Sequence, residues 1–380
     1  MVKVLNIITD MNIGGAGNVL MNFMRNTNRS EFHHTVMLPE GAQLAPILRA
    51  LDIDVIEVRG IAEKSFHLGS VRVFKQAFAR LNPELVHTHA SLSARIATRL
   101  WSKKCAIVHT RHCVYPQGRF KTVFPMKQAL GLINNRLSDL IIAVSPAAGD
   151  NLIETGTSPD KILTVFNGVE PMRELPHDEK GAVKASLGIA DDRFICAVIA
   201  RLVPEKGHEY ILGAAEILKD LPITFIIAGS GPILDRLRAI ADDRGLDNCV
   251  FTGFIEDIAT IENIMDLQLN ASYGTEATSL SLLEGMSLGI PAVVSDFGGN
   301  PYIITDGDNG TVVPQHDPAA LASAIRRLFD DPETLARMGG SSLQAFNGRF
   351  TAQAMTAGVE QVYRDAVKLR AGSAKSGKKR

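Results

Sequence analysis

The chain has 380 residues, with 40 Lys and Arg against 41 Asp and Glu, so its formal net charge at pH 7 is −1. This length favours two domains or one large one, and 46% hydrophobic residues exclude a disordered or collagen-like chain. The near-zero charge excludes a surface that binds polyanions everywhere, although it allows a basic face.

The four cysteines show neither C-x-x-C nor metal-ligand spacing, which is typical of a reduced compartment. The first ten residues lack the basic flank and the cleavage site of a signal peptide. No run reaches 18 apolar residues, the length that a membrane-spanning helix needs. We therefore expect a cytoplasmic protein.

Strands and helices alternate through the first part of the chain. Residues 2–9 (VKVLNIIT) form an apolar run typical of a buried parallel strand, and a glycine loop at 14–17 and a helix from Asn18 follow it. Further strands are predicted at 34–39, 54–58, 85–89, 106–110 and 139–145, with helices near 43–51, 70–81 and 91–101. This alternation predicts a parallel sheet covered by helices on both faces.

The alternation restarts after a polar, proline-bearing stretch at 171–182, which we interpret as a linker. Strands are predicted at 194–200, 223–229, 248–254, 267–272 and 291–296. The sequence thus predicts two Rossmann-like, doubly wound domains, at 1–172 and 173–350. Residues 351–369 have a helix-compatible pattern, and the Gly-, Ser- and Lys-rich tail at 371–380 is expected to be disordered.

The segment from Glu276 to Glu284 (EATSLSLLE) carries the sharpest chemical signal. Glu276 falls in a loop after a predicted strand, Thr278 or Ser279 is a plausible N-cap, and Glu284 lies within the following helix. That helix is apolar almost all round, so a carboxylate in it needs a partner. A solvent-facing Glu284 is the alternative, but a hydroxyl-rich ligand held by both carboxylates fits the pattern better.

Several motifs appear in one order that is similar to a known family. They are 201–207 (RLVPEKG), Glu276-x7-Glu284, 289–296 (GIPAVVSD), 298–300 (GGN) and 306–310 (DGDNG). Together they resemble the retaining nucleotide-sugar glycosyltransferases of family 4. That resemblance implies the GT-B architecture, in which two Rossmann-like domains face each other across a cleft. It also implies that the helix at 351–370 packs back onto the first domain.

The resemblance implies roles in the second domain. Arg201 and Lys206 would neutralise the donor diphosphate, Glu276 would hold the donor sugar, and Glu284 would bind the ribose. The backbone amides of Thr278, Ser279 and Leu280 would meet the distal phosphate at a helix N-terminus. Phe254 and Ile255 match a segment beside the nucleotide base, although an ordinary turn explains them equally well. Gly229 matches a turn that borders the donor, and it could serve backbone geometry alone.

In the first domain, Gly15 resembles a loop glycine that approaches the diphosphate. His112 matches a histidine near the donor sugar, whereas the glycine that usually follows is Cys113 here. His89 ends another strand and is a candidate for the acceptor side, as is Arg111. A structural role is the alternative for each histidine.

The expected reaction moves a hexose from a nucleotide diphosphate sugar, UDP- or GDP-linked, to a glycan or lipid-linked acceptor with retention of configuration. Such transfer serves the synthesis of bacterial surface glycan, lipopolysaccharide or glycolipid. Neither a cofactor nor a metal is expected, since no Asp-x-Asp pair stands at a strand end. A sugar-nucleotide epimerase on the same architecture is the main alternative. An NAD-dependent dehydrogenase and a sugar-binding module fit the motifs less well.

From Leu85 to Ser138 the chain has nine Lys or Arg and no Asp or Glu. Within this stretch, residues 114–126 interleave Phe120 and Phe124 with Arg119 and Lys121. Such a segment is typical of docking on anionic lipid headgroups at the inner face of a membrane. A phosphate-rich acceptor site, to which Arg119 and Lys121 would belong, and a solvated basic face are the alternatives. No nucleic-acid-binding module accompanies the charge.

Overall fold

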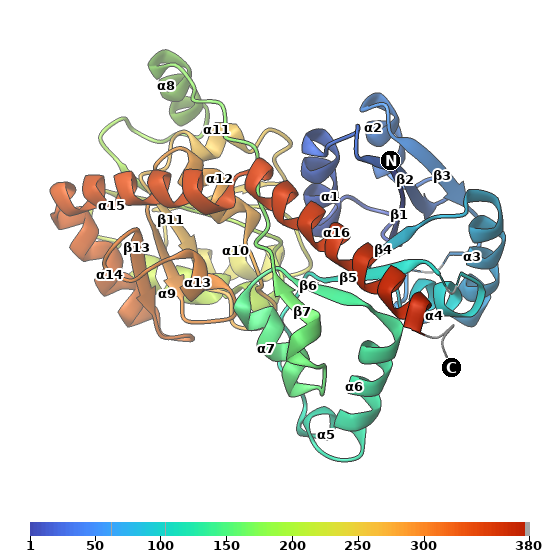
Figure 1. The fold of residues 1–380 in the computed structure, drawn as a ribbon. Helices are drawn as coiled ribbons and strands as arrows, with labels where there is room; N and C mark the ends of the chain where they lie inside the picture. The colour runs from blue at the N-terminus through green and yellow to red at the C-terminus, as the bar shows by residue number, and fades with distance from the viewer. Residues whose placement is uncertain (62, 103, 377–380) are drawn as a thin grey trace. The chain divides into compact units, whose positions relative to one another are not determined.

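The structure is a computed structural model that describes residues 1–376 apart from residues 62 and 103 (Figure 1). It divides into two compact units, each of which is described by itself. The first contains 1–113, 117–168 and the chain from Ala352, and the second contains 114–116 and 169–351. The division thus falls after Gly168, whereas the sequence analysis placed it after residue 172.

The first unit is built on a parallel sheet of seven strands in the order β3-β2-β1-β4-β5-β6-β7. The strands are β1 (Val2–Ile8), β2 (Phe32–Pro39), β3 (Asp54–Val58), β4 (Leu85–His89), β5 (Ala106–Arg111), β6 (Leu140–Ala143) and β7 (Ile162–Thr164). Every pairing is parallel, so all the carboxyl ends lie at one edge of the sheet. Ligands of such sheets bind beyond that edge.

Helices cover both faces of this sheet, and its central strands are accordingly buried on both sides. The helices are α1 (Gly15–Asn26), α2 (Leu44–Ala50), α3 (Leu68–Leu81), α4 (Leu92–Trp101), α5 (Arg119–Thr122), α6 (Met126–Leu137), α7 (Pro146–Glu154) and α16 (Ala352–Ser376). One apolar cluster packs α3 and α4 on one face, with Phe74 and Ile7 fully buried. The last helix, α16, lies against α1 and the strands β4 to β6 (Figure 1).

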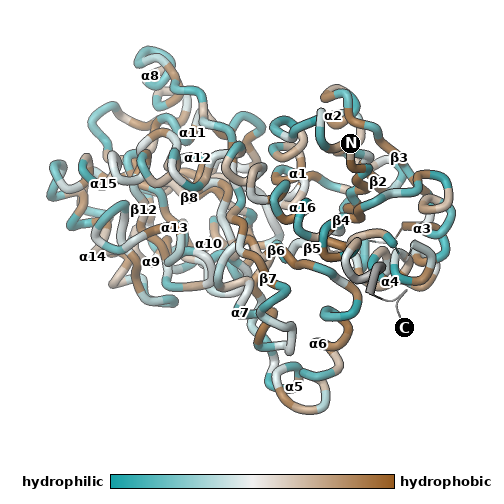
Figure 2. The backbone as a smooth tube through the Cα atoms, in the orientation of Figure 1, coloured by the Kyte–Doolittle hydropathy of each residue, from teal (hydrophilic) through white to brown (hydrophobic). Residues whose placement is uncertain are grey.

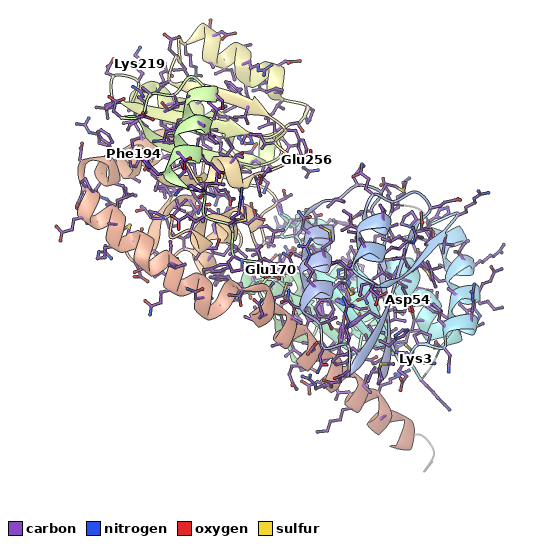
Figure 3. All side chains as sticks on the ribbon, turned by 90° about the horizontal axis from the view of Figure 1, so that it is seen from above. Lys3, Asp54, Glu170, Phe194, Lys219 and Glu256 are labelled. Atoms are coloured by element: carbon purple, nitrogen blue, oxygen red, sulfur yellow. The ribbon has the colours of Figure 1, made fainter. Side chains whose placement is uncertain are left out.

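The second unit is built on a parallel sheet of six strands in the order β10-β9-β8-β11-β12-β13. The strands are β8 (Phe194–Ile199), β9 (Ile223–Ala228), β10 (Cys249–Gly253), β11 (Leu267–Asn270), β12 (Ala292–Ser295) and β13 (Gly310–Val313). In Figure 3, Phe194 marks the start of β8. Two parallel-sheet α/β units confirm the fold class predicted from the sequence.

Eight helices accompany this second sheet in the described chain. They are α8 (His177–Ser186), α9 (His208–Ile217), α10 (Leu234–Asp243), α11 (Ala259–Glu262), α12 (Leu280–Ser287), α13 (Asn300–Ile303), α14 (Pro318–Asp330) and α15 (Pro332–Ala345). The main apolar cluster joins β8 and β9 to α9 and α14. By contrast α8 has no buried residue, and much of it is hydrophilic in Figure 2.

The tail differs from the sequence expectation. The helix predicted to end near residue 370 continues to Ser376, so residues 371–376 are helical rather than disordered. Ala371, Ala374 and Lys375 favour the helix, and although Gly372 does not, neither Pro nor a β-branched residue interrupts the extension. The remaining part of that expectation, 377–380, lies outside the described residues. Within the described chain no helix is both long and apolar enough to cross a membrane.

Candidate functional site

Two loops at the carboxyl edge of the second sheet carry the predicted residues Arg201, Lys206 and Glu276. The chain leaves β8 at Ile199 and passes Arg201 before a single turn of 3-10 helix that ends at Lys206. It leaves β11 at Asn270 and passes Glu276 before α12. Because β8 and β11 are parallel neighbours, these two loops emerge side by side.

Glu276 is the centre of a polar cluster. Its Oε2 lies 2.6 Å from the Lys206 Nζ, and it also accepts bonds from Asn270 Nδ2 at 3.2 Å and Ser272 Oγ at 3.3 Å. The Glu276 side chain is 6% exposed and that of Lys206 is 18% exposed. All three bonds go to one carboxylate oxygen. The pair therefore holds a cation and an anion in fixed positions at the sheet edge, where both can meet a polar ligand.

Glycines hold the Glu276 loop in place by close backbone approach. Gly298 has φ +59°, and a Cβ there would lie 2.0 Å from the carbonyl oxygen of Glu276. The Gly299 amide donates to the same oxygen at 3.1 Å, and a Cβ on Gly299 would lie 1.6 Å from the Ala277 oxygen. Any side chain at either position would displace the loop, which explains the pair of glycines in the motif.

His208 holds the Arg201 loop in place through a hydrogen bond to its backbone. This histidine is buried at the start of α9, and its Nε2 lies 3.2 Å from the Arg201 carbonyl oxygen. Burial lowers the pKa of His208 to about 4, so the ring is neutral and its Nε2–H donates to that carbonyl. The Arg201 side chain itself is exposed.

Two carboxyl groups lie deeper in the unit. Glu284, half-buried in α12, has its pKa raised to about 7 because burial disfavours its ionised form. Glu262, at the end of α11, is fully buried, and neither of its carboxyl oxygens has a hydrogen-bond partner in the described chain. Its pKa is raised well above the usual value by burial and then by the charge of Glu284. The sequence analysis missed Glu262, because one acid in a short helix carries no pattern.

The backbone amides in the first turn of α12 receive no hydrogen bond from the side chain of the N-cap residue, a feature that suits an anion site. Ser279 is the N-cap residue, as predicted, but its side chain makes no capping bond to the first-turn amides. Its Oγ instead lies 3.1 Å from the Ser281 Oγ. Thr278 and Ser279 are buried and Leu280 is half-buried.

Of the two residues predicted beside the nucleotide base, one is exposed and the other packs against the apolar core. Phe254 follows β10 and is 76% exposed, whereas Ile255 packs against an apolar cluster under the sheet. Glu256, labelled in Figure 3, is exposed in the same loop. Gly229 has φ +139°, and a Cβ there would lie 2.0 Å from the Ala200 oxygen, so backbone packing requires this glycine.

The first unit places its predicted residues at the carboxyl edge of its own sheet. His112 directly follows β5 and is half-buried, and its Nε2 lies 2.9 Å from Nδ1 of His89, the last residue of β4. Burial lowers the pKa of His112 to about 4 and that of His89 well below its usual value. Gly15 is the first residue of α1, and a Cβ there would meet nothing within 4 Å.

Several basic residues of the stretch 85–138 form hydrogen bonds or ion pairs within the first unit. Arg99 pairs with Asp139 at 2.8 Å, and Arg95 is buried with bonds to Asn134 and Ser138 at the end of α6. Arg111 donates to Asn151 at 2.9 Å. Arg119 and Lys121, in contrast, are exposed on α5.

The structure therefore brings Lys206 and Glu276 into contact, and His112 into contact with His89. Sequence reasoning missed the supporting side chains Asn270, Ser272, His208 and Glu262, and it named Asn300 only as part of the 298–300 motif. Asn270 and Ser272 had a visible signal, since they are polar residues at the end of an otherwise apolar strand. Asn300 is fully buried, and its Nδ2 donates to Ser295. In the described chain no group of three or more His, Cys, Asp or Glu residues could hold a metal ion.

Two families match consecutive parts of the chain. The family described as Glycosyltransferase Family 4 matches residues 13–173, and the one described as Glycosyl transferases group 1 matches residues 179–343. Among curated proteins, a D-inositol 3-phosphate glycosyltransferase of Corynebacterium efficiens is 27% identical over 80% of this chain and 78% of its own. The O-antigen chain mannosyltransferase C of Escherichia coli is 30% identical over 57% of this chain and 58% of its own.

Solved structures share the fold. Anabaena Alr3699/HepE in complex with UDP aligns with a TM-score of 0.83 and 21% identity, over 96% of this chain and all of that one. A glycosyltransferase from Rickettsia africae aligns with a TM-score of 0.84 and 19% identity, over 97% of this chain and 99% of that one.

Proposed function

The chain belongs to glycosyltransferase family 4 and is a glycosyltransferase of the GT-B type, and from this premise we propose that it transfers a hexose from a nucleotide diphosphate sugar to an acceptor hydroxyl with retention of configuration. The observation that carries the proposal is the Lys206–Glu276 pair at the carboxyl edge of the second sheet. A cation for phosphate and a carboxylate for sugar hydroxyls, 2.6 Å apart, match the two parts of such a donor.

In the proposed site, Lys206 and Arg201 neutralise the charge that grows on the leaving diphosphate, which is the term that lowers the barrier most. Glu276 holds the sugar hydroxyls, and the first-turn amides of α12 receive the distal phosphate at the positive end of the helix. Glu284 binds the ribose hydroxyls. Phe254, being exposed, offers a ring face to the base, while Ile255 supports the turn from the core.

We propose that His112 lies at the donor sugar and that Gly15 lets the backbone approach the diphosphate. No carboxylate is assigned as a nucleophile. The leaving phosphate accepts the proton of the acceptor hydroxyl on the same face, and the protein contributes mainly position and charge. A metal ion is not part of this mechanism.

The class of donor is proposed from the relatives. Anabaena Alr3699/HepE is described in complex with UDP and with UDP-glucose, and another relative is an O-antigen chain mannosyltransferase. The UDP complexes support a UDP-linked donor, and the mannosyltransferase supports a hexose donor and a role in building a surface glycan; a GDP-linked donor and a glycolipid product are carried over from the family resemblance.

The exposed residues of the basic segment support the proposal that the protein acts at a membrane surface. Phe120, Val123 and Phe124 are 67%, 44% and 78% exposed on and beside α5, and Leu132 and Ile133 are exposed on α6. We name these five residues, with Arg119 and Lys121, the α5–α6 patch; Figure 2 shows hydrophobic stretches on α6. Apolar side chains flanked by cations suit the anionic headgroup region at the inner face of a membrane. Arg111, another acceptor candidate, donates a hydrogen bond to Asn151.

The test is a thermal-shift screen followed by transfer assays. Since a ligand that binds only the native state raises the melting temperature, UDP or GDP should raise it and ADP should not. The stabilising nucleotide sugar should then be consumed only when an acceptor is added, and excess chelator should leave the rate unchanged. Conversion of the donor without an acceptor would instead indicate an epimerase, and loss of activity in chelator would overturn the metal-free mechanism.

A further inference from the structure

Two histidines from neighbouring strands form a direct ring-to-ring hydrogen bond in the first unit. His89 ends β4 and pairs in register with Thr110 of β5, which places His112 just beyond it. The His89 Nδ1 lies 2.9 Å from the His112 Nε2, and the rings stack with centroids 5.1 Å apart and an interplanar angle of 22°.

Both rings are neutral, because burial lowers the pKa of each. One proton therefore lies between the two nitrogens, and either His89 donates it or His112 does. The choice fixes the outer nitrogen of each ring. If His89 donates, its Nε2 is bare and His112 carries its own proton on Nδ1. If His112 donates, His89 carries an Nε2–H and the His112 Nδ1 is bare.

The surroundings of His89 favour the first arrangement. Its Nε2 is buried and has no hydrogen-bond partner in the described chain. The residue lines a small cavity whose walls are mostly apolar, among them Leu20, Phe23, Met355 and Val359, with Thr110 and Asn167 as polar neighbours. An N–H facing these apolar walls would be an orphan donor, which native proteins avoid more strictly than an under-used acceptor.

The two neighbouring histidines, His87 and His109, form their hydrogen bonds outside this pair. The ring of His87 lies 4.3 Å from that of His89. Its nitrogens are engaged elsewhere, Nδ1 at 2.7 Å from the Tyr363 hydroxyl and Nε2 at 2.6 Å from the Thr110 hydroxyl. His109 points its Nδ1 at the Thr88 carbonyl, 3.2 Å away.

We infer that His89 is a positioning residue that donates from Nδ1 to His112 and so holds the His112 ring in one orientation, with its remaining proton on Nδ1. His89 is only 5% exposed, so it acts through His112 rather than by touching an acceptor, the role that the sequence suggested. The inference rests on the proposed function in one respect, namely that His112 meets the donor sugar. There it presents an N–H donor to a sugar oxygen.

The first experiment needs neither donor nor acceptor. Nitrogen-15 NMR of histidine-labelled protein near pH 7 distinguishes protonated from bare ring nitrogens. We expect the His112 signals to show a bare Nε2 and a protonated Nδ1, and the His89 signals to show the reverse. A protonated His112 Nε2, or a mixture of both forms, would overturn the inference whatever reaction the protein catalyses.

Substitutions then test the effect on transfer. His89→Asn keeps a side-chain N–H near the position of Nδ1 and should preserve the His112 signals and the rate. His89→Leu should release His112 to a mixture of tautomers and lower kcat about tenfold, the order of loss that follows from misplacing a reacting group. The donor KM should change less than kcat.

The control is His34→Asn. His34 is buried in the same unit, with bonds to Asn6 and Thr27, and contacts neither member of the pair. It should lower stability without changing the His112 signals or kcat. If His89→Leu does not fold, the wild-type spectrum and His89→Asn still decide. Equal kcat for folded His89→Leu and wild type would refute the positioning role.

Discussion

At the scale of single residues, the Lys206–Glu276 pair concentrates the chemistry of the second unit. The two charges are largely buried and only 2.6 Å apart. Removing one partner of such a pair leaves the other charge uncompensated, which costs about 3 kcal/mol or more. The stability of the loop and the activity of the site therefore depend on the same contact.

A double-mutant cycle separates these two effects. Lys206→Met should lower the free energy of unfolding by about 3 kcal/mol, because it strands the Glu276 carboxylate. Lys206→Met with Glu276→Gln should recover most of that loss in urea titrations. Both the double variant and Glu276→Gln alone should lose about 100-fold in kcat. Full activity in Glu276→Gln would remove Glu276 from the proposed site.

Whereas the Lys206–Glu276 pair stabilises the fold, we expect the ionised form of Glu262 to destabilise it. The carboxyl pair of Glu262 and Glu284 has raised pKa values, about 7 for Glu284, so folding favours its protonated form. Its stabilising effect is complete below the unfolded pKa near 4.5 and is lost as the pH rises through 7. Glu262→Gln should therefore gain stability over wild type at pH 8 but not at pH 5. Equal melting-temperature differences at both pH values would contradict this account.

At the scale of elements, the strand ends and loops could be predicted from the sequence far better than what supports them. The apolar runs fixed the positions of β8 and β11, and the motif placed Glu276 in the loop before α12. What the sequence does not reveal is that Gly298 reaches the Glu276 carbonyl, since that contact joins loops from two different strands. Likewise, the partners of Arg95 and Arg99 on α6 and at Asp139 reduce the basic face predicted from a charge count.

Two glycines provide a matched test of that loop contact. Gly298→Ala and Gly307→Ala both force a side chain into the left-handed region, at φ +59° and +79°, which costs about 1 kcal/mol each. Only Gly298 faces another backbone, since a Cβ on Gly307 would meet nothing within 4 Å. We expect Gly298→Ala to lose more stability than Gly307→Ala because of this additional clash, and only Gly298→Ala to lose transfer activity at least tenfold.

The α5–α6 patch can be tested by sedimentation with vesicles of phosphatidylglycerol. Phe120→Ser with Phe124→Ser should weaken binding at least tenfold, since each buried aromatic contributes about 1.5 kcal/mol or more. Phe66→Ser is the control, because Phe66 is 53% exposed in the same unit but outside the patch. Binding of the wild type should fall as salt rises. Binding that ignores both salt and the patch substitutions would exclude this surface.

At the scale of the whole molecule, we expect the first unit to be the more sensitive to acid. The first unit buries neutral histidines, with the pKa of His34 lowered to about 4 and that of His87 to about 3. Their contribution is complete above the unfolded pKa of 6.5 and is lost as the pH falls toward those values. The acid pair of the second unit favours lower pH.

The pH profile of stability should therefore depend on the unit observed. Hydrogen exchange resolved along the chain should show the first unit losing more protection below pH 6 than the second, in which His208 also has its pKa lowered to about 4. His34→Asn should flatten the acid limb in the first unit alone. A uniform loss of protection in both units would contradict this division.

The position of α16 has a consequence for how the protein is made. Tyr363 on this helix is fully buried and bonds to His87 and Asn6, and Glu360 bonds to Thr27, so the first sheet is completed by the last helix of the chain. A ribosome delivers that helix only after the whole second unit has been synthesised. The first unit to be synthesised is thus the last to be completed. Until the chain is released, the surface that α16 later covers stays exposed and can be bound by chaperones.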